Sequence, residues 1–167
     1  MKIDLDISRC CACGACAVAC MDQNDIEVES GLRPFRSVFR DDWSQAESPA
    51  YFSIACMHCQ DAPCVPACPA GCIRKETSTG LTLYDNTRCI GCHSCAMACP
   101  FGAPAFGPDG RMRKCDGCAQ RLRAGLDPAC VRACAFGALR VVRGPDEELP
   151  PDRSLCALCG ELAKLQK

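Results

Sequence analysis

The sequence predicts an α+β protein with short helices and small β-hairpins, whose core is not held by apolar packing alone. Twenty of its 167 residues are cysteine, while leucine, isoleucine, valine and phenylalanine together supply only 31. That number of apolar side chains gives a thin core for a chain of this length. A third observation is a cysteine motif that recurs along the chain, with a short helical turn or strand expected after each copy. We therefore expect covalent or inorganic links to complete the core.

Charge and hydropathy exclude several classes of protein. The formal net charge of -1 gives no overall attraction to nucleic acid. Asp4, Asp6 and Arg9 interrupt the region where a signal peptide would be apolar, so we expect a cytoplasmic location, with export alongside a signal-bearing partner left open. Residues 89–108 carry no formal charge but contain four cysteines, three glycines and three prolines, which favours a binding site over a membrane span. In a reducing compartment, cysteines at this density are more often metal ligands than disulfides.

Sixteen of the cysteines fall into four groups of four. The first and third groups read C-x2-C-x2-C-x3-C, the second reads C-x2-C-x4-C-x3-C, and the fourth reads C-x2-C-x11-C-x3-C. The groups are Cys10, Cys13, Cys16 and Cys20; Cys56, Cys59, Cys64 and Cys68; Cys89, Cys92, Cys95 and Cys99; and Cys115, Cys118, Cys130 and Cys134. Three thiolates so close in sequence suit an iron-sulfur cube, in which each sulfur binds a different iron, better than a single zinc ion.

The spacing also indicates how the groups combine. In bacterial two-cluster ferredoxins the last cysteine of each run binds the other cluster, so the groups work in pairs. Four groups then make two ferredoxin-like modules that hold four [4Fe-4S] clusters. Two alternatives stay open at this point: a zinc site formed by the fourth group, and a disulfide framework in an oxidising compartment.

Three segments around the cysteine groups carry a resemblance to a known family. They read ACMHCQDAPCVPACPAGCI at 55–73, RCIGCHSCAMACPFGAP at 88–104 and KCDGCAQRLRAGLDPACVRACAFGAL at 114–139. The chain resembles, from Cys10 to about Val142, the four-cluster iron-sulfur subunits of the dimethyl sulfoxide reductase family, which serve molybdenum and tungsten pterin enzymes. It lacks the C-terminal extension by which some members meet a membrane anchor, which makes a quinone-linked partner less expected.

The resemblance implies two interlocked dicluster modules. The first and fourth groups would form an outer module, residues 1–23 and 109–143, and the second and third groups an inner module, residues 56–108. The implied ligand sets are Cys10, Cys13, Cys16 and Cys134 for cluster 1; Cys115, Cys118, Cys130 and Cys20 for cluster 2; Cys56, Cys59, Cys64 and Cys99 for cluster 3; and Cys89, Cys92, Cys95 and Cys68 for cluster 4.

The remaining elements follow from local patterns. Residues 73–84 predict a hairpin around the polar turn KETSTG, and residues 139–142 predict a closing strand. Residues 24–55 contain no cysteine and predict an insertion that covers the clusters, with Trp43 in its local core. In the tail, residues 144–167, leucines recur at helical intervals and predict a docking helix. The large apolar residues of the insertion are Phe35, Val38, Phe39, Trp43, Tyr51 and Phe52, and the tail leucines are Leu155, Leu158, Leu162 and Leu165.

Four residues inside the cysteine loops are candidates for tuning cluster potentials. At Gly14, Gly91 and Gly117 a bare backbone can approach the cluster and direct N–H groups at sulfur. His58 could donate a hydrogen bond to a cluster sulfur, or it could simply pack. The eight Arg and Lys residues within 111–143 could offset the negative charge of the clusters, form a solvated face, or dock an acidic partner.

Four cysteines lie outside the groups. We expect Cys11 and Cys72 to pack as small residues. We expect Cys156 and Cys159 to be structural thiols, with half of an intersubunit metal site as the alternative.

The sequence contains no phosphate-binding loop, dinucleotide fingerprint or nucleophile-base pair outside the cysteine loops, so we expect a non-catalytic electron carrier. The resemblance implies a large molybdenum- or tungsten-pterin subunit as its partner, with the outer module facing it. A flavin subunit linked to a nicotinamide, a quinone-linked anchor, a soluble carrier or further copies of the chain would lie at the other end. The alternatives are a free-standing polyferredoxin and a zinc or structural module.

Overall fold

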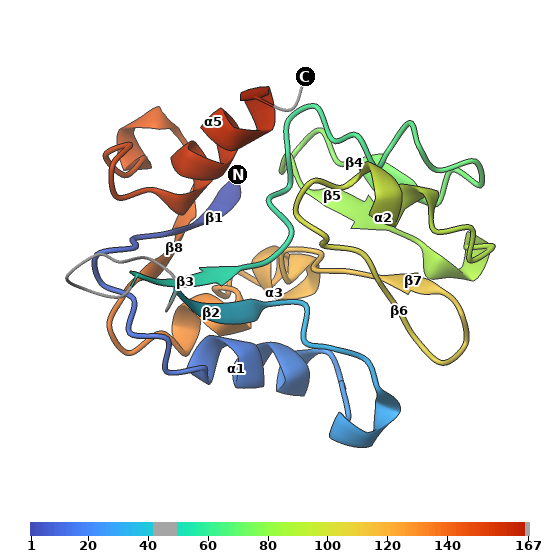
Figure 1. The fold of residues 1–167 in the computed structure, drawn as a ribbon, viewed down its shortest axis with the longest axis horizontal. Helices are drawn as coiled ribbons and strands as arrows, with labels where there is room; N and C mark the ends of the chain where they lie inside the picture. The colour runs from blue at the N-terminus through green and yellow to red at the C-terminus, as the bar shows by residue number, and fades with distance from the viewer. Residues whose placement is uncertain (42–49, 166–167) are drawn as a thin grey trace.

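The computed structural model describes residues 1–41 and 50–165, and its regular elements are short (Figure 1). Trp43, expected in a local core, lies outside the described residues. Every named strand pairs with one antiparallel partner, so the described residues form two-stranded sheets rather than one continuous sheet. The short helices, together with these small antiparallel sheets, confirm the predicted α+β class.

The strands pair across very different sequence separations. The pairs are β1 (Lys2–Leu5) with β8 (Leu139–Val142), β2 (Ser37–Asp41) with β3 (Ala50–Ile54), β4 (Ile73–Lys75) with β5 (Thr82–Tyr84), and β6 (Ala105–Phe106) with β7 (Met112–Arg113). The predicted hairpin is confirmed, with Ile73 opposite Tyr84, and so is the closing strand, with Leu139 opposite Leu5. The β6–β7 hairpin spans residues 108 and 109, where the sequence suggests a module boundary.

The cysteine loops lead into the helices. The α-helices are α1 (Ala15–Gln23), α2 (Ser94–Ala98), α3 (Ala119–Arg123), α4 (Ala129–Arg132) and α5 (Leu155–Leu165), and single 3-10 turns occur at Val28–Ser30, Asn86–Arg88 and Pro145–Glu147. Gly14, His93 and Cys118 are the N-caps of α1, α2 and α3, and each has a left-handed backbone. This conformation turns the chain sharply out of the loop and into the helix.

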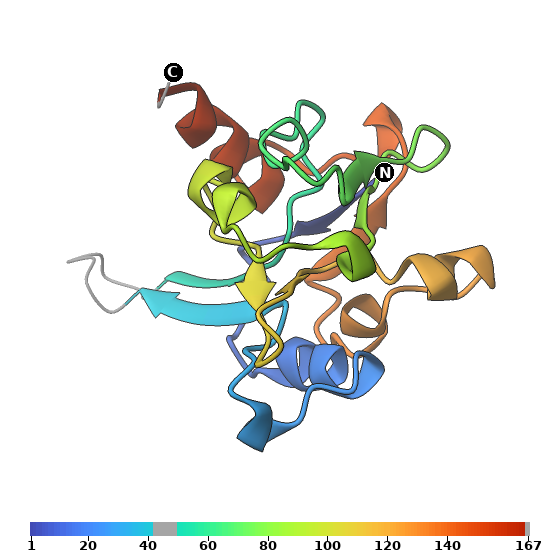
Figure 2. The same cartoon turned by 90° about the vertical axis from the view of Figure 1, so that its right-hand side faces the viewer.

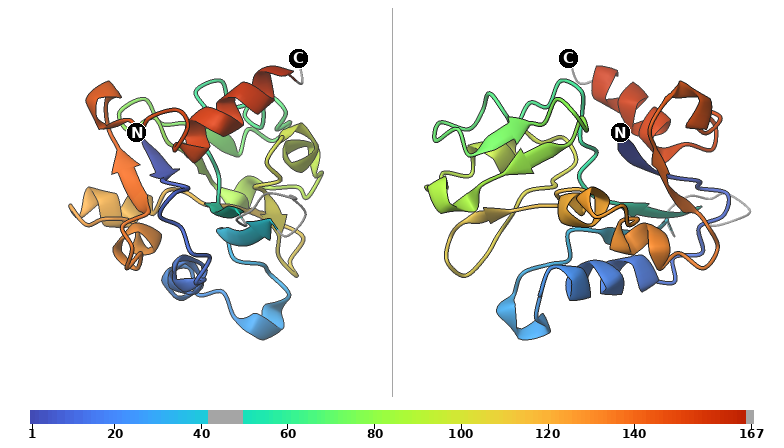
Figure 3. Two further views of the ribbon diagram at one scale, coloured as in Figure 1. Left: turned by 60° about the vertical axis from the view of Figure 1, so that its left-hand side comes forward. Right: turned by 180° about the vertical axis from the view of Figure 1, so that it is seen from behind.

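The two ends of the chain lie together. In Figure 1, β1, β8, α1 and α5 occupy one side of the molecule, and β4, β5 and α2 occupy the other. The same separation is visible from behind in Figure 3, and Figure 2 shows the β2–β3 hairpin projecting from the middle. No helix among the described residues is both long enough and apolar enough to cross a bilayer.

The buried apolar side chains gather around the cysteines. Leu5, Ala138 and Leu139 pack with Cys16 and Cys130, and Val38 and Phe52 of the β2–β3 hairpin cover this group. A second group joins Ile26, Leu32 and Phe35 to Cys20 and Cys115. The described parts of the segment, residues 24–41 and 50–55, therefore pack against cysteines of the outer groups.

The tail forms the predicted helix, α5, and it is attached to β1. Asp4 is buried, and its carboxylate accepts hydrogen bonds from the Ser154 hydroxyl at 2.6 Å and the Cys156 N–H at 2.9 Å. Leu155 packs on the core group that contains Leu5. The side chains of Leu162 and Leu165 lie outside the described part of the helix.

Candidate iron-sulfur cluster sites

All twenty cysteines carry free thiols, so the structure gives no support to a disulfide framework. Nor do any three His, Cys, Asp or Glu side chains in the described residues converge as a single metal ion requires.

One cavity is lined by the complete set of thiols expected for cluster 1. Cys10, Cys13, Cys16 and Cys134 surround a space of about 350 Å³, part of which is open to solvent. Cys10 and Cys13 come from the loop before α1, Cys16 lies in the first turn of α1, and Cys134 follows α4, which packs against α1. The remaining wall includes Val38, Ser53, Phe136 and Leu139. Two cysteine groups far apart in sequence therefore share one cavity.

A second cavity is lined by the thiols expected for cluster 4. Cys68, Cys89, Cys92 and Cys95 surround about 260 Å³, again partly open to solvent. Ile90, His93 and Phe106 line its rim, and the rings of His93 and Phe106 stack with centroids 3.7 Å apart. A fifth thiol, that of Cys72, lies on the same wall.

The thiols expected for clusters 2 and 3 are identified as neighbours because they raise one another's pKa. Burial, followed by the neighbouring Cys130 thiol, raises the pKa of Cys20 to about 11, and Cys118 adds to this effect. The pKa of Cys115 is raised by burial, by Cys56 and by Cys130. Cys20 is therefore close to Cys118 and Cys130, while Cys115 lies between Cys130 and Cys56 of the second group.

Burial and Cys56 raise the pKa of Cys64 to about 11, and Cys99 and Cys59 contribute in the same direction. Those four thiols are the set expected for cluster 3. The structure thus places Cys134 and Cys68 each in a cavity with three cysteines of another group, and Cys20 and Cys99 each close to two cysteines of another group.

A left-handed residue two positions after the first cysteine directs an N–H group at its sulfur. Gly91 N–H donates to Cys89 Sγ at 3.4 Å, and Gly117 N–H donates to Cys115 Sγ at 3.3 Å. Ala12 and His58 occupy the same position in the other two loops, and they also have positive φ. Gly14 has a different place, since it is the N-cap of α1.

In three groups the last cysteine begins a second motif, C-x2-G, which was not predicted to have a role. Gly71, Gly102 and Gly137 each have a φ of 58° and donate to the carbonyl of the preceding cysteine. The next N–H then donates to that cysteine's sulfur: Cys72 to Cys68 at 3.4 Å, Ala103 to Cys99 at 3.4 Å, and Ala138 to Cys134 at 3.2 Å. The sequence contains this signal as a glycine three residues after the last cysteine in three of the four groups. Cys20 has the Asn24 side chain instead, at 3.7 Å.

His58 is buried and bridges two cysteine groups. Its Nδ1 accepts a hydrogen bond from Thr82 N–H at 3.0 Å, and its Nε2 lies 3.8 Å from Cys115 Sγ. Burial, together with the positive charges of Lys114 and Lys75, lowers its pKa well below 6.5. A neutral ring that accepts at Nδ1 carries its proton at Nε2, and that proton faces the sulfur.

The surroundings of Arg36 indicate whether the cysteine sites of clusters 1 and 2 suit an anionic cluster. Its side chain is buried, and its Nε is without a hydrogen-bond partner in the described part of the chain. Burial opposes its charge, but the nearby thiols of Cys130, Cys115 and Cys16 outweigh burial and raise its pKa. A buried cation of this kind needs a compensating anion. A [4Fe-4S] core bound by four thiolates carries about two negative charges, so the residues present fit the group.

Lys114 is a second buried cation among the cysteines. Its Nζ donates to the carbonyls of Cys115 and Thr82 and lies 3.7 Å from Cys56 Sγ. Within the basic segment 111–143, this residue is therefore placed for charge compensation rather than for solvation. Arg36 was not predicted as a site residue, because a buried arginine has no local signature in the sequence.

Two of the four extra cysteines lie against the predicted ligands. Cys72 Sγ lies 3.3 Å from Cys68 Sγ. Burial acts to raise the pKa of Cys68, but hydrogen bonds from Cys72 and from backbone N–H groups outweigh it and lower that pKa. Burial and this same contact raise the pKa of Cys72, so Cys68 is the more acidic thiol of the pair. Cys11 is exposed at the rim of the cluster 1 cavity.

The other two extra cysteines lie on α5. Burial and the Asp4 carboxylate raise the pKa of Cys156. Cys159 is buried, and burial likewise raises its pKa. The Cys156 thiol also donates to the Ile3 carbonyl of β1 at 3.6 Å, a packing contact that fits the structural role expected for it.

Four sets of four thiols, held by ferredoxin-type loops with N–H groups directed at sulfur, define an iron-sulfur electron-transfer protein. Comparison with known proteins agrees. The family model for the 4Fe-4S dicluster domain matches residues 48–143. The chain belongs to this family of iron-sulfur proteins, and it is a non-catalytic electron-transfer subunit.

Three relatives illustrate the proteins to which this chain is similar. The probable anaerobic dimethyl sulfoxide reductase chain YnfG of Escherichia coli K12 is 39% identical over 153 residues, which are 87% of this chain and 73% of that protein. The thiosulfate reductase electron transfer subunit PhsB of Salmonella typhi is 38% identical over 86% of this chain and 76% of its own. The formate dehydrogenase iron-sulfur subunit of Wolinella succinogenes is 35% identical over 83% and 79%.

Proposed function

We propose that this chain relays single electrons through four [4Fe-4S] clusters between a molybdenum- or tungsten-pterin catalytic subunit and a second redox partner. The ligand sets are those given above for clusters 1 to 4, divided between an outer and an inner module that interlock. When bound, each cluster accepts and releases one electron. The relatives named above support the partner class, because their names assign them to reductase and dehydrogenase complexes.

The observation that carries the proposal is the pair of separate cavities that each open to solvent. The cluster 1 cavity lies beside α1 and includes Phe136, which is 53% exposed. The cluster 4 cavity lies beside α2, where Ile90 and Met97 are 69% and 86% exposed. α1 and α2 lie far apart in Figures 1 and 2. A relay needs this arrangement, since electrons must enter at one end and leave at the other.

Three buried side chains, Arg36, Lys114 and His58, lie among the predicted ligands of clusters 1, 2 and 3. Arg36 lies among thiols of clusters 1 and 2, and Lys114 reaches from Cys115 to Cys56, that is, from cluster 2 to cluster 3. His58 joins the same two sets. We propose that these side chains offset the negative charge that builds up as each cluster is reduced.

We propose that the second redox partner binds at the cluster 4 cavity. A flavin subunit linked to a nicotinamide, a quinone-linked anchor and a further copy of the chain each fit a cluster 4 cavity with an apolar rim. We propose a cytoplasmic setting, in which a reducing environment would keep all twenty thiols reduced.

Association of the tagged chain in its native host tests the proposal. We expect anaerobic purification to recover a large pterin subunit that contains molybdenum or tungsten. Phe136→Asp should release that subunit, whereas Met97→Asp should retain it and block transfer to the second partner. Leu126→Asp is the matched control, because Leu126 is 47% exposed but lines neither cavity. Recovery of the wild-type chain alone would indicate a free polyferredoxin instead.

A further inference from the structure

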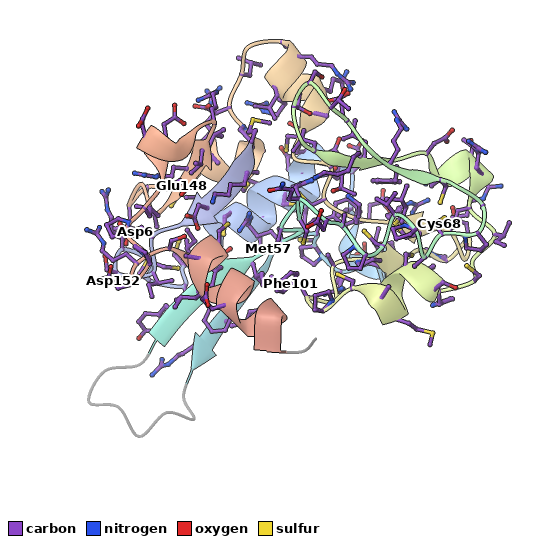
Figure 4. The ribbon with its side chains drawn as sticks, turned by 90° about the horizontal axis from the view of Figure 1, so that it is seen from above. Asp6, Met57, Cys68, Phe101, Glu148 and Asp152 are labelled. Carbon is purple, nitrogen blue, oxygen red and sulfur yellow. The ribbon has the colours of Figure 1, made fainter. Side chains whose placement is uncertain are left out.

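The cluster 4 cavity contains one thiol more than a cluster needs. Cys72 lines the cavity together with Cys68, Cys89, Cys92 and Cys95. Its side chain is 3% exposed, and its Sγ lies 3.3 Å from that of Cys68. Cys68 lies in the part of the molecule remote from α5, as Figure 4 shows. The extra thiol is therefore at the same site as a predicted ligand and directly beside it.

The C-x2-G turn explains why residue 72 is so close. In each of three turns the backbone N–H four positions after the cysteine donates to its sulfur, at 3.2 to 3.4 Å. The side chain at that position therefore begins next to the ligand. After Cys99 and Cys134 it is alanine, Ala103 and Ala138, and after Cys68 it is Cys72. The chain thus contains two natural counterparts that lack the extra thiol.

We propose that Cys72 is an alternative ligand for the iron that Cys68 binds in cluster 4. This inference rests on the ligand sets of the proposed function. In the described structure, the Cys72 and Cys68 sulfurs lie within hydrogen-bond distance of each other. In the exchange, the iron–sulfur bond to Cys68 breaks, a bond from Cys72 sulfur to the same iron forms, and the Cys72 proton passes to the Cys68 sulfur. No electron moves, so the cluster keeps its oxidation state.

Removal of each thiol in turn tests the exchange. We expect Cys68→Ala to retain about sixteen irons per chain after anaerobic purification, as wild type does, because Cys72 completes the site. The double variant with Cys68→Ala and Cys72→Ala should fall to about twelve irons if cluster 4 is lost, or about fifteen if a three-iron cluster remains. Cys72→Ala alone should retain about sixteen, because Cys68 is present.

Cys99→Ala is the matched control, since Ala103 cannot replace the missing ligand. It should lose one cluster, or show the spectrum of a three-iron cluster in the oxidised state, where Cys68→Ala shows neither. The midpoint potential of cluster 4 should also shift in Cys68→Ala, because the ligating sulfur has changed its hydrogen bonds. If Cys68→Ala loses iron as Cys99→Ala does, or does not fold, the inference is overturned.

The two proposals fail in different ways. If the wild-type chain holds far fewer than about sixteen irons, or if Cys99→Ala keeps them all, the ligand sets of the proposed function are wrong. If wild type and Cys99→Ala behave as expected and only Cys68→Ala departs, the ligand sets stand and the alternative ligand is rejected.

Discussion

The Nε2 atom of His58 lies 3.8 Å from the Sγ atom of Cys115, although the two residues are 57 positions apart in the chain. His58 belongs to the second cysteine group, and Cys115 opens the fourth. Because Nδ1 accepts from Thr82, the Nε2 proton faces the sulfur, so the contact connects the inner and outer cysteine groups through a polar side chain.

We expect His58→Ala to lower the midpoint potential of the cluster that Cys115 binds. A hydrogen bond to a ligating sulfur favours the reduced, more negative cluster, and the variant removes it. His93→Ala is the control, because His93 is exposed and stacks on Phe106. Redox titration followed by EPR measures both variants. Equal shifts in the two would contradict a specific role for His58.

The potential of that cluster should not depend on pH through His58 between pH 7 and 9. The pKa of His58 is lowered well below 6.5. The ring is therefore neutral throughout this range, and it would gain a proton only at lower pH. Titrations at three pH values should show the same His58→Ala difference at each. A difference that changes within the range would mean that the ring titrates there.

Replacement of Arg36 should destabilise the loaded protein strongly. Arg36→Met removes a buried cation and leaves the thiolates of clusters 1 and 2 uncompensated, an effect of about 3–5 kcal/mol on unfolding. Arg36→Lys should recover part of it. Arg132→Met removes an exposed charge and should change little. Anaerobic denaturation, followed by loss of the visible cluster absorbance, compares the three. A wild-type midpoint in Arg36→Met would show that the buried charge is not needed.

The loop glycines should differ in their tolerance of a side chain. A Cβ on Gly91 would lie 2.8 Å from the carbonyl oxygen of Gly110, whereas a Cβ on Gly14 meets nothing within 4 Å. Gly14→Ala should therefore cost only its left-handed backbone, about 1–2 kcal/mol. Gly91→Ala adds a clash with backbone and should also lose iron from cluster 4. Iron content and denaturation midpoints measure the contrast, and equal losses would argue against it.

Asp6 should contribute to stability in a pH-dependent way. Burial acts to raise its pKa, but hydrogen bonds from Arg153 and Ser8 outweigh burial and hold that pKa below 3.8. The contribution is complete above the unfolded value and disappears as pH falls through the lowered folded value. Asp6→Asn should thus cost about 1–3 kcal/mol, constant from pH 8 to 5, with exposed Asp152→Asn as control. A cost that already shrinks between pH 8 and 6 would contradict this.

The sequence predicts local features of this fold better than distant ones. The hairpin at 73–84 and the strand at 139–142 follow from period-two patterns, and α5 follows from leucine spacing. β1 was not predicted, because Asp4 breaks the apolar pattern. Burial of the Asp4 carboxylate becomes favourable only when Ser154 and Cys156, near the other end of the chain, donate hydrogen bonds to it.

The same limit applies to the sites. Cysteine spacing predicts the four groups, because loop geometry is local, whereas the neighbours of the loops are set by tertiary packing. Arg36 and Ser53 come from a segment without cysteines, yet Ser53 Oγ lies 3.2 Å from Cys16 Sγ and also accepts from Arg36. The contact of His58 with Cys115 is likewise invisible in the spacing. The C-x2-G turns, by contrast, could have been read from the sequence.

The most direct test of the relay is the metal content of the chain purified anaerobically from its native host. We expect about sixteen irons and about sixteen acid-labile sulfides per chain, after subtraction of the partner's own clusters, together with stoichiometric molybdenum or tungsten from a co-purifying subunit. Sixteen irons without either metal would reject the proposed partner but keep the clusters. Zinc in place of iron, or about eight irons, would contradict the four-cluster account itself.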